Sequence, residues 1–285
     1  MRLAIICAVL TAGVWAAESN LERAQSLYSH TDYAGAVRLL NEASRDPNEL
    51  RLLGQCRFML NDLRHAGDVL EKAAAFAPND AMIQLWLGRV QGRRAETAFA
   101  MRGLSLAGQT REAFEKAVKL DPKNREALND LFDFYLEAPG IVGGGVDKAR
   151  ALLPVLDKVD PVEAWHARAR LEEQAKHYDS AEADLRHAVA MEPSNTGQIV
   201  NLARFLARRR RYPESDEWFD RATRIEPNSP RVLYAKAETW LQSNRRRNEA
   251  RALLKQYLAG GNLTPDDAAR AEAAKLLSKA EAGGS

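Results

Sequence analysis

The sequence has little cysteine and almost no excess charge. Cys7 and Cys56 are its two cysteines among 285 residues, so the chain is not built on a framework of disulfides. The 41 basic and 39 acidic side chains leave a formal net charge of +2. This balance argues against a dedicated nucleic-acid binder, and no nucleic-acid partner is expected. With 46% hydrophobic and 28% charged residues, the composition is that of an ordinary folded chain.

The sequence also lacks the residue patterns of a catalytic, metal or cofactor site. The five histidines have no zinc-ligand spacing with a third ligand nearby, and no serine lies in a nucleophile-elbow motif. Residues 143–145 are three glycines that precede Lys148, but two residues intervene and no hydroxyl follows, which excludes a phosphate-binding loop. A turn with positive φ is the interpretation of these glycines, with a partner-contact loop as the alternative. We therefore predict no enzyme, no metal and no cofactor.

Long apolar runs are absent except at the N-terminus. Arg2 is followed by an almost wholly apolar stretch at 3–14, and Ala16 offers a small residue at a cleavage position. Residues 1–16 are typical of a secretory signal peptide, and the run is short for a membrane span. We expect an exported, periplasmic bacterial protein whose mature chain begins near Ala17. Anchoring in the inner membrane by an uncleaved N-terminal segment is the alternative. Without this segment Cys56 has no cysteine partner, and it is interpreted as a small helix residue.

The remainder of the chain repeats one unit, which is clearest at residues 47–80. A leucine-glycine pair ending at Gly54 lies in a first apolar-periodic segment, Ala66 and Ala73 lie in a second, and Pro78 follows. Small residues allow two helices to pack closely, and a proline cannot continue a helix interior. One such hairpin cannot bury its apolar face alone, so neighbouring hairpins must stack on it.

This order of leucine-glycine, alanine, leucine and proline resembles the signature of the tetratricopeptide repeat (TPR) family. Pro122 follows Pro78 by 44 residues and Pro161 follows Pro122 by 39, which predicts two expanded repeats near 81–161. The first is expected to have longer helices, and the second to have a loop at 137–145. Residues 80–155 also resemble a group of exported bacterial TPR proteins of undefined role, a likeness that adds no activity.

We therefore predict an all-α, right-handed α-solenoid of about seven TPR helix-turn-helix repeats at residues 17–258, with a C-terminal capping helix and short tail at 259–285. Thr264 is predicted to cap that last helix, with Pro265 in its first turn and its end near Ala280. The resemblance implies a non-catalytic scaffold of the bacterial cell envelope that binds a protein or peptide. The alternative is an accessory subunit or chaperone of an envelope enzyme or glycan machinery.

In the TPR family the first helices line a concave face that grips an extended peptide or its terminal carboxylate. The resemblance places these residues there: Arg51, Gln55, Arg89, Arg93, Asn129, Asp133, Glu137, His166, Arg170, Asn201, Arg204, Arg208, Tyr234 and Glu238. They depart from the family's lysine-asparagine clamp. Arg170, Asn201 and Arg204 are nevertheless predicted at matching heights, where they would hold an acidic segment or C-terminus. The peptide's basic part would face Asp133 and Glu137. A solvated groove wall is the alternative.

Charge is unevenly distributed along the chain. Residues 125–161 hold 4 basic and 7 acidic side chains, whereas residues 196–258 hold 14 basic and 7 acidic. The arginine runs at 208–211 and 245–247 fall at turns between first and second helices, and stacking would set them along one edge. This edge is predicted to contact lipid headgroups of a membrane or an acidic partner, with a solvated edge as the alternative. Its candidate residues are Arg209, Arg210, Arg211, Arg245, Arg246 and Arg247.

Overall fold

The computed structural model describes residues 19–261 and 263–282, which contain helices and no strand. No helix in this part of the chain has both the length and the hydropathy needed to cross a membrane. The predicted signal peptide at 1–16, with Cys7, lies outside the described residues. Its cleavage therefore stays a prediction.

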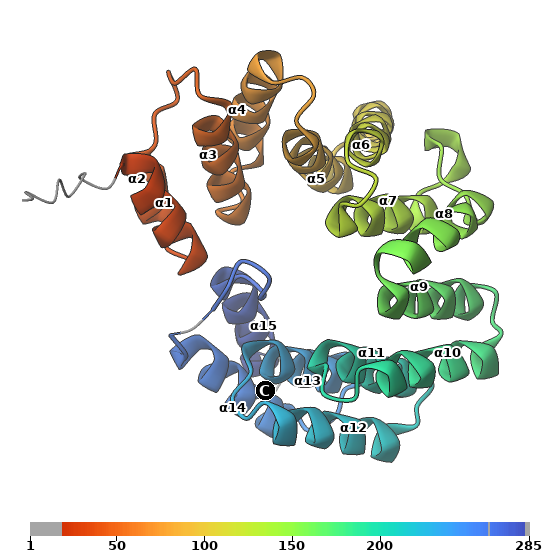
Figure 1. The fold of residues 1–285 in the computed structure, drawn as a ribbon. Coiled ribbons are helices and arrows are strands. Elements are labelled where there is room, and N and C mark those ends of the chain that lie inside the picture. The colour runs from red at the N-terminus through yellow and green to blue at the C-terminus, as the bar shows by residue number, and fades with distance from the viewer. Residues whose placement is uncertain (1–18, 262, 283–285) are drawn as a thin grey trace, which may run out of the picture.

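Fourteen of the described α-helices form seven antiparallel hairpins, repeats 1 to 7, as predicted. Figure 1 shows them following one another round an open arc, with first helices on the inner side and second helices outside. A fifteenth helix, α15 (Arg270–Ala282), packs against α14 and α13. The pairs are α1 (Asn20–Ser29) with α2 (Tyr33–Leu39), α3 (Pro47–Met59) with α4 (Leu63–Phe76), α5 (Ala81–Thr97) with α6 (Ala100–Leu120), α7 (Arg125–Glu137) with α8 (Val146–Val159), α9 (Pro161–Gln174) with α10 (Tyr178–Met191), α11 (Thr196–Arg208) with α12 (Tyr212–Ile225), and α13 (Pro230–Gln242) with α14 (Arg247–Ala259).

Local chemistry sets the ends of these helices. Five second helices end two residues before a proline, which cannot donate a backbone hydrogen bond; the prolines are Pro78, Pro122, Pro161, Pro193 and Pro227. Six first helices follow a side chain that accepts a backbone N–H; these caps are Ser19, Asp46, Asp80, Asn124, Asp160 and Asn195. Five hairpin turns contain one residue with φ between +53° and +63°; these are Thr31, Asn61, Lys176, Arg210 and Asn244. The hairpins are thus largely encoded in short stretches of sequence.

Close packing inside the hairpins depends on small residues, as predicted. A Cβ atom added at Gly54 would lie 2.5 Å from Leu70 Cγ, and one added at Gly88 would lie 2.4 Å from the Phe114 ring. Both separations are well inside van der Waals contact. A side chain at either position would therefore push the two helices apart.

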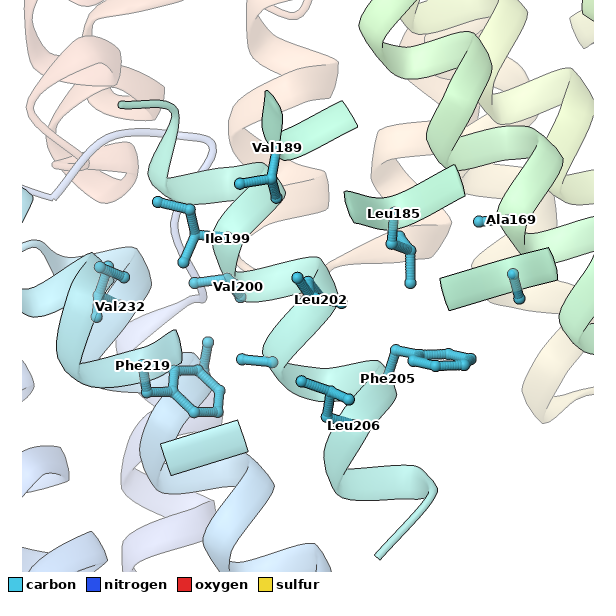
Figure 2. Packing of buried hydrophobic residues seen from close by; sticks show 14 residues of the cluster. Ala169, Leu185, Val189, Ile199, Val200, Leu202, Phe205, Leu206, Phe219 and Val232 are labelled. Carbon is cyan, nitrogen blue, oxygen red and sulfur yellow. The ribbon is translucent and has the colours of Figure 1, made fainter. Parts of the chain in front are cut away.

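Helix α11 lies at the centre of one buried cluster, formed with neighbouring helices (Figure 2). Val189 on α10, Phe219 on α12 and Val232 on α13 surround it. Nine of its 13 residues are buried, so apolar side chains cover most of its circumference. This buried packing fixes the position of the few polar groups that α11 presents on the inner side of the arc.

The two expanded repeats adopt the predicted forms. In repeat 3 the helices α5 and α6 have 17 and 21 residues, against 13 and 14 for α3 and α4. In repeat 4 a 3-10 turn at Gly140–Val142 is followed by Gly143 and Gly145 with φ of +94° and +153°. Lys148 Nζ donates to the Gly143 carbonyl at 2.8 Å. The glycines are therefore used for backbone conformation, and the lysine closes the same turn.

The predicted start of the capping helix is wrong. The backbone N–H and hydroxyl of Thr264 both donate to Asp267, at 2.8 and 3.0 Å, but they close an isolated turn. The helix begins at Arg270, whose guanidinium donates to carbonyl oxygens at the end of α14. The Tyr257 hydroxyl donates to the Ala268 carbonyl. Bonds from α14 thus hold the intervening segment as a folded turn.

Candidate functional site

Two neighbouring hollows lie along the first helices of repeats 4 to 7. The smaller, of about 630 Å³, lies between α7, α9 and α11, and the larger, of about 880 Å³, lies between α9, α11, α13 and the turn at 266–268. Asn201 and Arg204 line both. The smaller hollow also gathers five more predicted residues, which are Asp133, Glu137, His166, Arg170 and Arg208. Tyr234 joins the larger hollow, whereas Arg51, Gln55 and Arg89 line neither.

The arginines predicted to clamp a peptide carboxylate already bind carboxylates of the chain itself. Arg170 bonds to Asp133 through one terminal nitrogen and to Glu137, at 2.7 Å, through the other. Arg204 Nη2 donates to Glu238 at 2.7 Å. The sequence correctly placed these arginines, with Asn201, on neighbouring helices at one site. It did not show that their charges are compensated there.

These bonds belong to a series of ion pairs that joins successive first helices from α5 to α13. Arg89 on α5 bonds to Glu126 and Asp130 on α7 at 2.9 and 2.6 Å. Arg208 on α11 bonds to Glu173 on α9 at 2.7 Å. The sequence contained a sign of these ion pairs, because the partners are opposite charges separated by about one repeat. Arg204 and Glu238, for example, are 34 residues apart. The series fixes the inner face of the arc as a set of neutralised charges.

Burial opposes ionisation at the α7 end of this series. Desolvation raises the pKa of Asp130 and of Asp133, and the bonds from Arg89 and Arg170 offset only part of that effect. The paired arginine therefore favours the charged form of each carboxylate, and its removal would leave a partly buried Asp130 and a half-exposed Asp133 unpaired.

Several polar groups of the larger hollow have no partner within the described residues. Gln198 is 7% exposed, and its buried Oε1 atom accepts no hydrogen bond there. The side chains of Asn201, Tyr234 and Arg231 also make no hydrogen bond or ion pair within that part of the chain. Buried polar groups are usually satisfied, and the Gln198 oxygen is an exception at the wall of this hollow.

Arg231 is a site residue that the sequence analysis missed. Its Nη1 atom lies 3.1 Å from where a Cβ atom of Gly197 would stand, so the glycine leaves room for the guanidinium. Arg231 is the second residue of α13, directly after Pro230. A cation near a helix N-terminus is unfavourable, because the macrodipole is positive there. An arginine in this unfavourable position was the feature of the sequence that could have identified Arg231 as a site residue.

The fold agrees with comparisons to known proteins. Residues 173–239 match the tetratricopeptide repeat family. The chain is thus similar to TPR proteins in this segment. A TPR protein from Parabacteroides merdae has a TM-score of 0.61 at 13% identity, over 92% of this chain and 97% of that chain. A thermophilic TPR protein from Thermus thermophilus has a TM-score of 0.53 at 20% identity, over 70% of this chain and 97% of that chain.

A chain of the APC/C hetero-tetramer Cut9-Hcn1 also has a similar fold, with a TM-score of 0.52 at 13% identity. The match covers 93% of this chain and 49% of that chain. No curated protein matches the sequence. At these identities the likenesses concern the fold alone.

The predicted basic edge is largely used to join adjacent TPR repeats. Arg211 bonds to Glu182 of the preceding repeat and to Glu214 beside it. Arg245, 34 positions later, bonds to Asp216 at 2.7 Å, again in the preceding repeat. Three of the remaining candidates contact other residues. Arg209 stacks on Tyr178 at 3.5 Å, Arg246 bonds to Asp216 at 3.4 Å, and Arg247 donates to Asn244 at 3.2 Å. The fourth, Arg210, is exposed.

Cys56 lies outside both hollows and is fully buried on α3. Desolvation raises the pKa of its thiol to about 12, which leaves it protonated at neutral pH. The interpretation of Cys56 as a small helix residue agrees with this burial.

Proposed function

We propose that this TPR protein is a non-catalytic scaffold that binds an extended segment of a partner protein along the two hollows. The observation that carries the proposal is a hollow of about 880 Å³ lined by Asn201, Arg231 and Tyr234, whose side-chain polar groups make no hydrogen bond or ion pair within the described residues. An extended peptide exposes backbone N–H and C=O groups with no partner of their own, and these can bond to such side chains.

The polar groups of the larger hollow suit a backbone with an acidic group nearby. Asn201 supplies an amide that both donates and accepts, so it can bond to a peptide backbone whatever the peptide's side chains are. Arg231 is an unbonded cation at the same hollow, and Arg204 engages Glu238 through one nitrogen. A carboxylate of the partner, in an acidic segment or at its C-terminus, can bond to these two guanidinium groups.

This arrangement moves the proposed carboxylate contact from Arg170 toward Arg231. Both terminal nitrogens of Arg170 are engaged by Asp133 and Glu137. A basic group of the peptide would have to compete with Arg170 for those two carboxylates. The contact with the peptide's basic part is therefore the weaker element of the proposal.

The proposed setting is the bacterial envelope, on the basis of the signal-like residues 1–16. A pull-down from periplasmic extract distinguishes the proposed roles. A defined enzyme in fixed stoichiometry indicates an accessory subunit, varied unfolded clients indicate a chaperone, and one non-enzyme partner indicates a scaffold. Contact of the basic edge with an anionic surface stays a prediction.

The test of the groove is a double variant, Asn201→Ala with Arg231→Ala. Neither side chain bonds to other described residues, so the melting temperature is expected to stay at the parent value. Recovery of the partner in the pull-down is expected to fall by about tenfold or more, the loss of one or two charge-assisted bonds. Arg64→Ala, at an exposed position outside both hollows and outside the basic edge, is the matched control and should recover the partner normally. A double variant that recovers as much partner as the control would show that the hollows are not the site.

A further inference from the structure

Large apolar side chains are exposed along one edge of repeats 2 to 4. Phe99 is 93% exposed, Met101 is 79% exposed and Ile141 is 81% exposed, and Leu60 and Leu104 are also exposed. All five lie at or next to the turn between the first and second helix of their repeat. Because the hairpins stack in the same orientation, these turns share one edge of the solenoid. We refer to these five residues as the apolar tips.

The tip of repeat 3 projects beyond the turns of its neighbours. Helix α5 starts at the usual place after its cap, but has 17 residues against 13 in α3 and in α7. Helix α6 ends two residues before Pro122, as usual, but has 21 residues against 14 in α4 and in α8. The extra four to seven residues extend the hairpin toward this edge by roughly 6 to 10 Å, at about 1.5 Å per residue. Phe99 and Met101 therefore stand at the end of a rigid projection.

Cationic side chains surround the projecting tip. Arg93 and Arg102 lie on either side of Phe99 along the chain, and Glu96 is the one acidic residue between positions 93 and 105. Arg93 pairs with Glu96 at 3.5 Å, and Arg94 donates to Gln91 at 3.1 Å. Arg102 is exposed, and its side chain makes no hydrogen bond or ion pair to the described residues. Farther along the same edge, the turns of repeats 5 and 6 present the exposed Lys176 and Arg210. The edge thus combines projecting apolar groups with an excess of positive charge.

A lipid bilayer fits these features better than a folded protein partner does. None of the hollows described along the chain is lined by an apolar tip, whereas protein interfaces concentrate their energy in close-packed pockets. Separate convex tips do not offer such a surface, but a fluid headgroup layer can close round each of them. The projection of repeat 3 also matches the 5–10 Å depth to which amphipathic elements enter that layer. Basic side chains beside the tips would lie among lipid phosphates.

We propose that the apolar tips insert into the headgroup region of an anionic lipid bilayer, with the arginines of the same edge on the lipid phosphates. This contact uses a surface separate from the peptide groove, and it leaves both hollows open to a partner. The chain is then a peripheral membrane scaffold, which holds its partner at the bilayer surface.

Vesicle co-sedimentation tests the proposal. The sample is the chain from residue 17, which contains every described residue and lacks the apolar segment 1–16. It is expected to sediment with vesicles of phosphatidylcholine mixed with phosphatidylglycerol, and much less with phosphatidylcholine alone. Added salt is expected to weaken the binding, because it screens the arginines.

The deciding variant is Phe99→Ser with Met101→Ser. Both side chains are exposed, so the melting temperature should not change, while vesicle affinity falls by about tenfold or more. The matched control makes the same two replacements at Phe76 and Met191, which end α4 and α10 at the opposite edge, and should bind vesicles as the parent does. A Phe99→Trp reporter is expected to be quenched by lipids with brominated acyl chains.

Three results would overturn the proposal: a parent chain that stays in the supernatant with anionic vesicles, a tip variant that binds as tightly as the control, or a Trp reporter that brominated lipid does not quench. Loss of a protein cross-link or of a dimer in the tip variant, with no vesicle binding by the parent, would instead make the tips a protein interface.

Discussion

The substitution Gly88→Ala tests the helix packing of the expanded repeat directly. The added Cβ would lie 2.4 Å from Phe114 Cδ1 and Cε1, more than 1 Å inside ordinary van der Waals contact. Phe114 is buried against Leu85, Ala117 and Leu131, so its ring has little room to move away. The change should therefore force α5 and α6 apart or drive the ring from its rotamer.

The expected magnitude comes from two opposing terms. Overpacking of a core costs about 1–3 kcal/mol. Replacing glycine by alanine inside a helix gains about 0.5–1 kcal/mol. The sum is a net loss of up to about 2.5 kcal/mol in the free energy of unfolding. The larger Gly88→Leu should lose more than Gly88→Ala, because its whole side chain meets the same ring.

Gly108→Ala is the matched control, because it lies on α6 of the same hairpin with no atom within 4 Å of the added Cβ. It makes the identical replacement without the clash and should stabilise the protein by about 0.5–1 kcal/mol. Urea unfolding followed by circular dichroism measures both variants. The double variant Gly88→Ala with Phe114→Leu should lose less than the sum of the two single variants, since the shorter side chain relieves the clash.

The reasoning would be refuted if Gly88→Ala shifted the urea midpoint upward, as Gly108→Ala should. That result would mean that α5 and α6 lie farther apart at this position. Equal and additive effects of the Gly88 and Phe114 substitutions would have the same meaning.

Three further predictions follow from the ion pairs and the N-terminus. Asp216→Ala is expected to lower the free energy of unfolding by about 3 kcal/mol, because it leaves the Trp240 indole N–H, bonded at 2.7 Å, without an acceptor. Asp216→Asn should lose less stability, and the same urea titration measures both variants. Burial raises the pKa of Glu182, but bonds from arginines outweigh this and lower the pKa below 4.5. The resulting stability is present above pH 4.5 and is lost as the pH falls further, so Arg211→Gln should flatten the acid side of a plot of melting temperature against pH. The intact mass of the exported protein should correspond to a chain that begins near Ala17, and a mass that still includes residues 1–16 would favour the anchored form.

The sequence predicted the repeat architecture because local chemistry encodes it. The leucine-glycine pairs, the alanines and the prolines each act within a few residues of their own position, through packing space and backbone hydrogen bonds. Seven hairpins, the longer helices of repeat 3 and the glycine turn of repeat 4 could therefore be read from short segments. The placement of Arg170, Asn201 and Arg204 on neighbouring helices followed from the same repeat register.

What each of those side chains bonds to was decided by the tertiary structure. Arg204 meets Glu238 across a spacing of 34 residues, and Arg245 meets Asp216 across 29. Neither contact exists until one hairpin stacks on the next, at a distance along the chain where many other pairs of opposite charge occur. The start of α15 at Arg270 likewise depends on carbonyl groups at the end of α14. Local sequence set the elements, but only stacking brought opposite charges within bonding distance, and that determined which polar groups were left free for a partner.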